Sequence, residues 1–322
     1  MKAIRYYRYG SPEVLEVRDV EVPTAGDDEV LVRVRAASVN PLDWHFMRGT
    51  PYLVRAMAGP FRPKVNGLGA DLAGQVEAVG RNVTRVRPGD EVFGSHRGTF
   101  AEYVAVGEDA VVAKPANLTF EEAAAVPVAA FTAVQALRDK GHVKPGQRVL
   151  INGASGGVGT FAVQLAKAFG AEVTGVCSAG NVELVRSIGA DRVVDYTTDD
   201  FTRTGDQYDL LIDIAGGRTL SDLRRVLASN GVLVGVGGPD TGNWIGPLAG
   251  LARMVVLNRL VRQTLVPMLS RSSRDDLVLL HRLLGSGKIR PVIDRTYKLG
   301  EVPDAVRYLE AGHARGKVVI TI

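Results

Sequence analysis

The first third of the chain alternates apolar and polar positions with a period of two. In residues 29–39, EVLVRVRAASV, valines at positions 30, 32 and 34 alternate with Leu31, Arg33 and Arg35. This is the period of a strand with one buried face. Similar short segments follow at 74–80, 87–94 and 100–115, with Gly and Pro between them. Closely spaced short strands of this kind predict a small β-barrel or sandwich.

The pattern changes after Asn117. Residues 118–137 are rich in alanine and lack alternation, which predicts a helix. Almost wholly apolar segments then alternate with helical ones. The strands are expected at 147–153, 171–177, 191–196, 208–216 and 231–238, and the helices at 160–169, 181–188 and 219–229. Apolar strands that alternate with helices indicate a parallel sheet covered on both faces.

These patterns predict an α/β protein of two domains. A doubly wound domain is expected over residues 123–289, and a β-rich domain over residues 1–122. The tail returns to strand character in IRPVIDRTYKL and GKVVITI. We therefore assign residues 290–322 to the first domain, which makes that domain discontinuous.

Composition narrows the function. The chain has 39 basic and 35 acidic residues, a net charge of +4, and no basic tract with interleaved aromatics, which argues against nucleic acid as a partner. A single cysteine, Cys177, excludes an internal disulfide and a multi-cysteine zinc site. No apolar signal sequence and no uncharged apolar run of about 18 residues is found, so we expect a cytoplasmic protein without an integral membrane segment. Residues 244–269 are apolar but carry arginines, and a lid, an interface and a membrane-surface contact all remain open for them.

The segment GASGGVG, residues 153–159, could be a mobile loop or a phosphate-binding turn. It lies between a predicted strand and a predicted helix, which is the context of a dinucleotide-binding fingerprint. Glycines there let main-chain N–H groups approach a pyrophosphate at the positive end of a helix. The predicted cofactor contacts of this turn are Ala154, Ser155, Gly156, Gly157, Val158 and Gly159, with Ala154 at the position of the first fingerprint glycine.

The end of the second strand of this domain bears on the choice of cofactor. NAD-binding domains carry an acidic residue about 20 residues after the turn, which binds the ribose 2′-hydroxyl. Here the strand ends in TGVCSAGN, so Ser178 stands where a carboxylate is expected. A hydroxyl can bind a 2′-phosphate that a carboxylate would repel, which favours NADPH. Ser178 could instead only cap the following helix.

Several segments in order resemble the medium-chain dehydrogenase/reductase superfamily, in its zinc-independent quinone oxidoreductase (zeta-crystallin-like) branch. They are NPLDWHFMRG, GLGADLAGQVEAVG, RPGDEVFG, INGASGGVGTFAVQLAKAFGAEVTGVCS and GHARGKVVI. The resemblance implies a GroES-like β-barrel substrate domain beside a Rossmann dinucleotide-binding domain, and a homodimer. It implies no metal site, because Asn40 stands where zinc members have a cysteine and Gly69-Ala70-Asp71 replaces their Gly-His-Glu.

The resemblance also implies site residues. Asn40 is expected near the nicotinamide ribose and the substrate, and Tyr52 as a hydroxyl donor to the substrate, although Tyr52 could be only a loop aromatic. Further cofactor contacts are implied at Thr132, Tyr196, Ala215, Gly216, Val236, Gly237, Gly238, His313, Arg315 and Lys317. Thr132 could instead bond within its own helix, and the three tail residues could be plain surface charge. Relatives often have Lys or Arg just after the Ser178 position, where this chain has Ala179-Gly180-Asn181.

The expected activity is hydride transfer from NADPH to a hydrophobic small molecule, either a quinone or an α,β-unsaturated carbonyl. Two alternatives remain at this point. One is a related alkenal or enoyl reductase, and the other is an NADPH-binding structural or interaction protein with little turnover.

Overall fold

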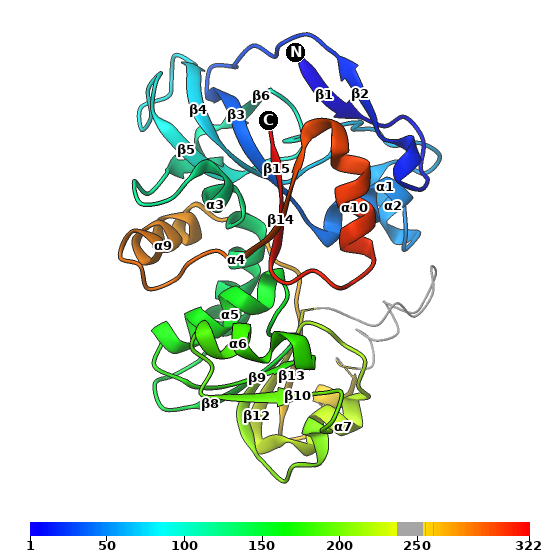
Figure 1. Ribbon diagram of the computed structural model, residues 1–322, viewed down its shortest axis with the longest axis vertical. Helices are drawn as coiled ribbons and strands as arrows, with labels where there is room; N and C mark the ends of the chain where they lie inside the picture. Colours follow the sequence, from blue (N-terminus) through cyan, green and yellow to red (C-terminus); the bar gives the residue numbers. More distant parts are fainter. Residues whose placement is uncertain (237–253, 255, 260) are drawn as a thin grey trace. The chain divides into compact units, whose positions relative to one another are not determined.

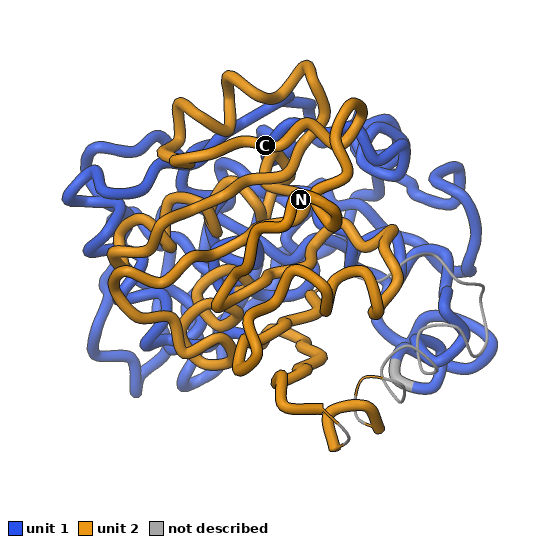
Figure 2. Tube along the Cα trace, turned by 90° about the horizontal axis from the view of Figure 1, so that it is seen from below, with its two compact units in different colours: residues 1–131, 272–322 blue, residues 132–271 orange. Residues whose placement is uncertain are grey.

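The computed structural model describes residues 1–236, 254, 256–259 and 261–322. The described chain divides into two compact units (Figure 2): unit 1 is Met1–Phe131 with Ser272–Ile322, and unit 2 is Thr132–Arg271. The sequence-based boundaries were 122/123 and 289/290, so unit 1 takes in more residues on both sides. The reason is packing, because helix α3 (Phe120–Ala124) lies against strands β3 and β4 and helix α9 (Arg274–Gly285) lies against β7, all three strands belonging to unit 1.

Unit 1 is built on a mixed seven-stranded sheet (Figure 1) with the strand order β14-β15-β3-β4-β5-β7, and β6 pairs with β3. Its strands are β3 (Glu29–Val39), β4 (Asp71–Val79), β5 (Glu91–Ser95), β6 (Tyr103–Gly107), β7 (Val111–Ala113), β14 (Ile293–Lys298) and β15 (Lys317–Thr321), and a separate antiparallel pair is formed by β1 (Lys2–Arg5) and β2 (Glu16–Asp19). Its remaining helices are α1 (Pro41–Arg48), α2 (Leu53–Ala58) and α10 (Val302–Glu310).

The tail of the chain is part of the unit 1 sheet. Strand β15 pairs antiparallel with β3, with Val318 opposite Val39, and β3 pairs antiparallel with β4, with Ser38 opposite Asp71. Helix α10 packs on this sheet, and its buried face joins a core cluster that includes Ile4, Tyr6 and Phe100. The register therefore aligns the beginning of β15, the end of β3 and the beginning of β4.

Unit 2 is a six-stranded, wholly parallel sheet with the order β10-β9-β8-β11-β12-β13 (Figure 1). Numbered within the sheet this is 3-2-1-4-5-6, the order of a doubly wound dinucleotide-binding fold. Its strands are β8 (Arg148–Asn152), β9 (Glu172–Cys177), β10 (Arg192–Asp195), β11 (Tyr208–Asp213), β12 (Leu227–Gly235) and β13 (Thr264–Pro267). Its described helices of six residues or more include α5 (Gly157–Ala168), α6 (Val182–Ser187) and α7 (Leu220–Arg225). The predicted pairing of a doubly wound sheet with a second, β-rich unit is confirmed.

Two local predictions were wrong. Residues 118–137 are not one helix, because α3 ends before Pro127, which begins α4 (Pro127–Val134), and a π-helical stretch, Gln135–Lys140, follows. Proline lacks the N–H group that a continuous helix needs but fits a first helical position. The helix expected at 219–229 ends at Arg225, since Leu227 already pairs with Tyr208 of β11.

Candidate functional site

The glycine-rich turn of unit 2 joins β8 to α5. Packing or backbone conformation requires glycine at some of its positions but not at all of them. A Cβ on Gly159 would lie 2.0 Å from the carbonyl oxygen of Gly153, so α5 can cross the turn only with glycine there. Gly153 has a positive φ of 90°, which also favours glycine. A Cβ on Gly156 would meet nothing closer than 3.6 Å. Packing therefore does not require glycine at position 156, and its bare backbone is open to a ligand.

Gly156 is also the N-cap residue of α5. It has extended backbone angles, and helix α5 runs for twelve residues from Gly157. The first N–H groups of a helix have no partner within the helix and carry a partial positive charge, which together favour a phosphate. The methyl group of Ala154 is buried, and a Cβ on Gly175 of β9 would lie 3.0 Å from it. Ala154 therefore fills space against β9, which explains an alanine where the fingerprint has its first glycine.

Two serines and an asparagine meet beside this turn. The Asn181 side-chain nitrogen, Nδ2, donates to Ser155 Oγ at 3.2 Å and to Ser178 Oγ at 3.1 Å. Ser178 directly follows β9 and is half-buried. Tyr196 directly follows the neighbouring strand β10 and its side chain is exposed. The structure thus brings the turn and the end of β9 into one polar cluster.

Polar residues also stand at the carboxyl ends of β8 and β11. Asn152 Nδ2 donates to the Asp213 carboxylate at 2.7 Å and to the carbonyl oxygen of Gly216 at 3.1 Å, and the Gly216 N–H donates back to Asp213 at 3.1 Å. Burial raises the pKa of Asp213, and the hydrogen bonds from Asn152 and Gly216 oppose that rise. The hydrogen-bonded pair of Asn152 and Asp213 holds the predicted contacts Ala215 and Gly216 beside the glycine-rich turn. Sequence reasoning missed Asn152 and Asp213, although a polar residue that ends an apolar strand at the ligand edge was a usable signal.

Two further predicted contacts lie elsewhere in unit 2. The N–H of Val236 donates to the carbonyl oxygen of Asp213 at 2.9 Å, directly after β12. Gly237 and Gly238 lie outside the described residues, as do residues 244–253, 255 and 260 of the 244–269 segment. The Thr132 hydroxyl, on α4, donates to Ser270 Oγ at 2.9 Å.

In unit 1, Asn40 lies in a buried polar network that spans three adjacent strands. Its Oδ1 accepts from Lys317 Nζ at 2.6 Å, and its Nδ2 donates to Asp71 at 2.8 Å and to the Ser38 carbonyl oxygen at 3.3 Å. Asp71 also accepts from the Ser38 hydroxyl at 2.6 Å and from the Val128 N–H at 2.8 Å. Both amide hydrogens of Asn40 are therefore used inside unit 1, and a lone pair on Oδ1 is its remaining capacity.

Asp43, the third residue of α1, extends this network. Its two carboxylate oxygens accept from the N–H groups of Asn40 at 2.7 Å and of Gly69 at 3.0 Å. Burial raises the pKa of Asp43 to about 7. The backbone bond from Asn40 opposes that rise, the charge of Asp71 adds to it, and the Gly69 bond and the Lys317 charge oppose it.

Tyr52 is the N-cap residue of α2. Its ring lies beneath the guanidinium of Arg55, which is 4.8 Å from the ring centroid and 4.7 Å from that of Tyr9. The predicted catalytic pair, Asn40 and Tyr52, therefore has one fixed, buried member and one half-buried member whose ring contacts Arg55.

The three predicted tail contacts separate into two kinds. His313 and Arg315 are exposed, and the N–H of Arg315 donates to Asp294 at 2.9 Å. Lys317 is buried, and its ammonium is 2.6 Å from Asn40 and 3.4 Å from Asp71. The sequence predicted all three as cofactor contacts, with surface charge as the alternative, whereas the pairing of β15 with β3 turns Lys317 into the interior.

The described residues contain no cluster of three or more histidine, cysteine, aspartate or glutamate side chains placed to hold a metal ion. Burial, with a smaller contribution from the charge of Asp195, raises the pKa of Cys177 to about 11, which disfavours the thiolate that metals bind. Within the same described part of the chain, the structure has no helix with the length and apolar character to span a bilayer.

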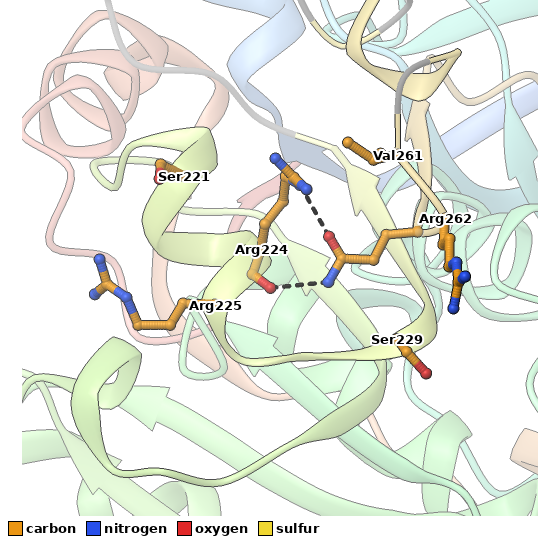
Figure 3. A pocket seen from close by; sticks show the side chains of 7 residues that line it. Ser221, Arg224, Arg225, Ser229, Val261 and Arg262 are labelled. Atoms are coloured by element: carbon orange, nitrogen blue, oxygen red, sulfur yellow. Dashed lines mark hydrogen bonds between the residues drawn. The ribbon is translucent and has the colours of Figure 1, made fainter.

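One open hollow of unit 2 lies apart from these residues (Figure 3). It has a volume of about 530 Å³ and is lined by Ser221, Arg224, Arg225, Ser229, Val261, Arg262 and Gln263. Arg224 Nε donates to Gln263 Oε1 at 2.9 Å, and Gln263 Nε2 donates back to the Arg224 carbonyl oxygen at 2.9 Å. None of the predicted site residues lines it.

Two family models match the chain, one within unit 1 and the other running from unit 2 into the tail of unit 1. Residues 26–116 match the family model described as alcohol dehydrogenase GroES-like domain, and residues 188–320 match that described as zinc-binding dehydrogenase. The chain is 35% identical to a chloroplast envelope quinone oxidoreductase homolog of Arabidopsis thaliana, over 99% of this chain and 98% of that protein. It is 37% identical to a 2-methylene-furan-3-one reductase of Solanum lycopersicum, over 99% of this chain and 79% of that protein. The structure of an Escherichia coli quinone oxidoreductase complexed with NADPH has a TM-score of 0.85 and 25% identity, and each chain is covered completely.

Proposed function

This chain belongs to the medium-chain dehydrogenase/reductase superfamily, beside its quinone oxidoreductases, and from this premise we propose that it transfers hydride from NADPH to a quinone or an α,β-unsaturated carbonyl without zinc. The observation that carries the proposal is the turn before α5. Gly156 has open space around it although Gly153 and Gly159 are closely packed. Glycine at a position where a side chain would fit suggests that the backbone there must be approached closely by a ligand.

The residues present fit a pyridine dinucleotide. The N-terminus of α5 suits the pyrophosphate, the serine hydroxyls at the end of β9 and in the turn suit a phosphorylated ribose, and the ends of β11 and β12 lie at the ligand-binding edge of the sheet. NADPH, when bound, supplies the hydride. The protein's part is to bind and orient the two reactants and to stabilise the charge that forms on the carbonyl oxygen.

Asn40 and Tyr52 then take different roles. Because both N–H bonds of the Asn40 amide are spent on Asp71 and Ser38, Asn40 has no donor left for a developing oxyanion. The remaining lone pair on its Oδ1 could accept a hydrogen bond from a hydroxyl group, such as one of the nicotinamide ribose, near which Asn40 is expected. Tyr52 remains the candidate donor to the substrate oxygen, with Arg55 against its ring.

The donor set of the described residues does not fit catalytic zinc, although one matching family model is described as zinc-binding. Asn40 and Asp71 stand in the segments where zinc members carry ligands, and Asp71 already accepts from Ser38, Asn40 and Val128, with Lys317 close by. A carboxylate so fully bonded to protein donors has little capacity for a metal ion. We therefore derive no step through zinc.

The test is loss of NADPH absorbance with a panel of quinones and enones, before and after dialysis against a chelator. We expect turnover that the chelator leaves unchanged, with enones among the substrates, as the name of the tomato relative suggests. Tyr52→Phe should lower kcat by about tenfold or more, since one lost oxyanion donor costs about 10²-fold or more in well-studied sites. An unchanged rate would remove Tyr52 from the mechanism.

The second candidate function is an NADPH-binding protein with little turnover. Tight NADPH binding without oxidation by any member of the panel would support it instead. Absence of binding to either reduced pyridine dinucleotide would overturn both candidates. The choice between a quinone and an enone as substrate stays open, and the cytoplasmic location and the homodimer stay predictions.

A further inference from the structure

We propose that Asn181 determines the preference of this chain for NADPH over NADH, by turning the hydroxyls of Ser155 and Ser178 into donors for the 2′-phosphate. The inference rests on the proposed function, because it presupposes that the glycine-rich turn binds a pyridine dinucleotide. The resemblance places Ala179-Gly180-Asn181 where relatives often have a basic residue. The contacts of the Asn181 side chain give it a positive role.

The three side chains come from three different segments of unit 2. Ser155 belongs to the turn before α5, Ser178 follows β9, and Asn181 ends the short 3-10 turn Ala179–Asn181. The Asn181 Nδ2 atom bridges the two hydroxyl oxygens, at 3.2 Å from Ser155 Oγ and 3.1 Å from Ser178 Oγ. Asn181 therefore ties the phosphate-binding turn to the strand end where dinucleotide-binding domains recognise the adenosine ribose.

The orientation of the Asn181 amide follows from what surrounds it. As oriented, its Oδ1 is buried and accepts no hydrogen bond from the residues that the structure describes. The reverse orientation would bury the NH₂ group there instead, with two donors unsatisfied rather than one acceptor. Unsatisfied buried donors carry the full desolvation penalty, so the observed orientation is the less costly one.

This orientation fixes the direction of both hydroxyls. A serine hydroxyl has one hydrogen to donate and two lone pairs. Because each Oγ receives a hydrogen from Asn181, neither hydroxyl can point its own hydrogen back along that bond. Both O–H groups are therefore free to donate outward. The site therefore offers a ligand two hydroxyl donors.

A phosphorylated ribose matches that set better than an unphosphorylated one. A phosphate has strong acceptor oxygens for the two donors, and hydrogen bonds to a charged acceptor are the stronger kind. NADH offers only a neutral 2′-hydroxyl to the same donors.

No acidic residue stands at the carboxyl end of β9. The strand ends at Cys177, and Ser178 and the exposed residues Ala179 and Gly180 follow it. On the neighbouring strand, Asp195 Oδ1 accepts from the N–H and the hydroxyl of Thr197, at 2.9 and 2.7 Å. That carboxylate oxygen is bonded within its own turn rather than to the serines.

The experiment is calorimetric titration of the full chain with NADPH and with NADH, for the wild type, Asn181→Ala and Asn181→Asp. The alanine variant releases both hydroxyls to rotate, and we expect NADPH affinity to fall by about fivefold with NADH affinity changed by less than about twofold. In the aspartate variant a carboxylate accepts from both hydroxyls and repels phosphate, so NADPH affinity should fall by at least about tenfold. The control is Asn230→Asp, which adds the same charge at an exposed position of β12 and should leave the NADPH-to-NADH ratio unchanged.

The outcomes separate the two levels of the argument. If the wild type binds neither cofactor, the proposed function fails. If the wild type prefers NADPH and either Asn181 variant keeps the wild-type ratio, the role of Asn181 is wrong while the proposed function stands. Thermal unfolding of each variant shows that it is folded, and Ser178→Ala, which should lose NADPH affinity selectively, decides the matter where an Asn181 variant does not fold.

Discussion

Replacing Lys317 by methionine tests whether a buried charge pair holds the polar network of unit 1. The substitution keeps an unbranched side chain of similar length and removes the ammonium. That group lies 2.6 Å from Asn40 Oδ1 and 3.4 Å from Asp71 Oδ2. The side chains of Lys317 and Asp71 are 4% and 0% exposed, so water has no ready access to the Asp71 carboxylate when its partner is lost.

The expected loss of stability depends on the hydrogen bonds that Asp71 keeps in the variant. Removing one partner of a buried ion pair destabilises a protein by about 3–5 kcal/mol, because the other charge is left buried. In the variant, Asp71 would still accept from three donors, which are the Ser38 hydroxyl, the Asn40 amide and the Val128 N–H. Those bonds spread the remaining charge, so we expect a loss of about 3 kcal/mol, the lower end of the range.

The assay is urea unfolding followed by tryptophan fluorescence. The chain has two tryptophans, so a Trp244→Phe background leaves Trp44, which packs against the core cluster of unit 1. With a denaturant dependence of about 2 kcal/mol per molar urea, a loss of 3 kcal/mol lowers the midpoint by about 1.5 M. Lys288→Met is the matched control, because Lys288 is exposed in unit 1 and its replacement should change stability by less than about 0.5 kcal/mol.

A double-mutant cycle with Asp71→Asn supplies the decisive comparison. If the two side chains are paired, the double variant should be more stable than the sum of the single effects by about 1 kcal/mol or more. A Lys317→Met loss below about 1 kcal/mol, together with additive effects, would refute the pairing.

Two further predictions test the polar network and the turn. The pKa of Asp43 is raised from 3.8 to about 7, so its contribution to stability is fully present below about pH 4 and is lost as the pH rises through about 7. Over that window the urea midpoint of unit 1 should fall more steeply in the wild type than in Asp43→Asn, and equal slopes would contradict the assignment. Gly156→Ala should fold normally, since its Cβ would meet nothing within 3.4 Å. It should lose NADPH affinity, because the added methyl group would block the close approach of the pyrophosphate to the backbone. Gly159→Ala should instead lower the thermal stability of unit 2, because its Cβ would lie 2.0 Å from the Gly153 carbonyl oxygen, and a stable Gly159→Ala protein would sink that packing argument.

Much of unit 2 could be read from local pattern. Apolar strands that alternate with helices predicted the parallel sheet, and GASGGVG between a strand and a helix predicted the dinucleotide turn. These signals are local because strand period, helix period and a tight turn each depend on a few neighbouring residues. The helix expected at 219–229 is present, but its predicted end was wrong, because pairing of Leu227 with Tyr208 overrides the helical preference after Arg225.

The contacts between distant segments could not be read in this way. Lys317 and Asn40 are 277 residues apart, and only the register of β15 on β3 brings them together. Asn181 looked like a missing basic residue because its bonds to Ser155 and Ser178 exist only when the turn and the end of β9 fold side by side.

The sequence alone therefore determined the type and order of the main elements, the bare-backbone turn and the absence of an acidic residue at the end of β9. The tertiary structure decided which polar groups pair, and with that which are still able to meet a ligand. The physical reason is that strand and helix periods repeat along neighbouring residues, whereas hydrogen-bond capacity is used up by partners that only strand register and chain crossing can supply.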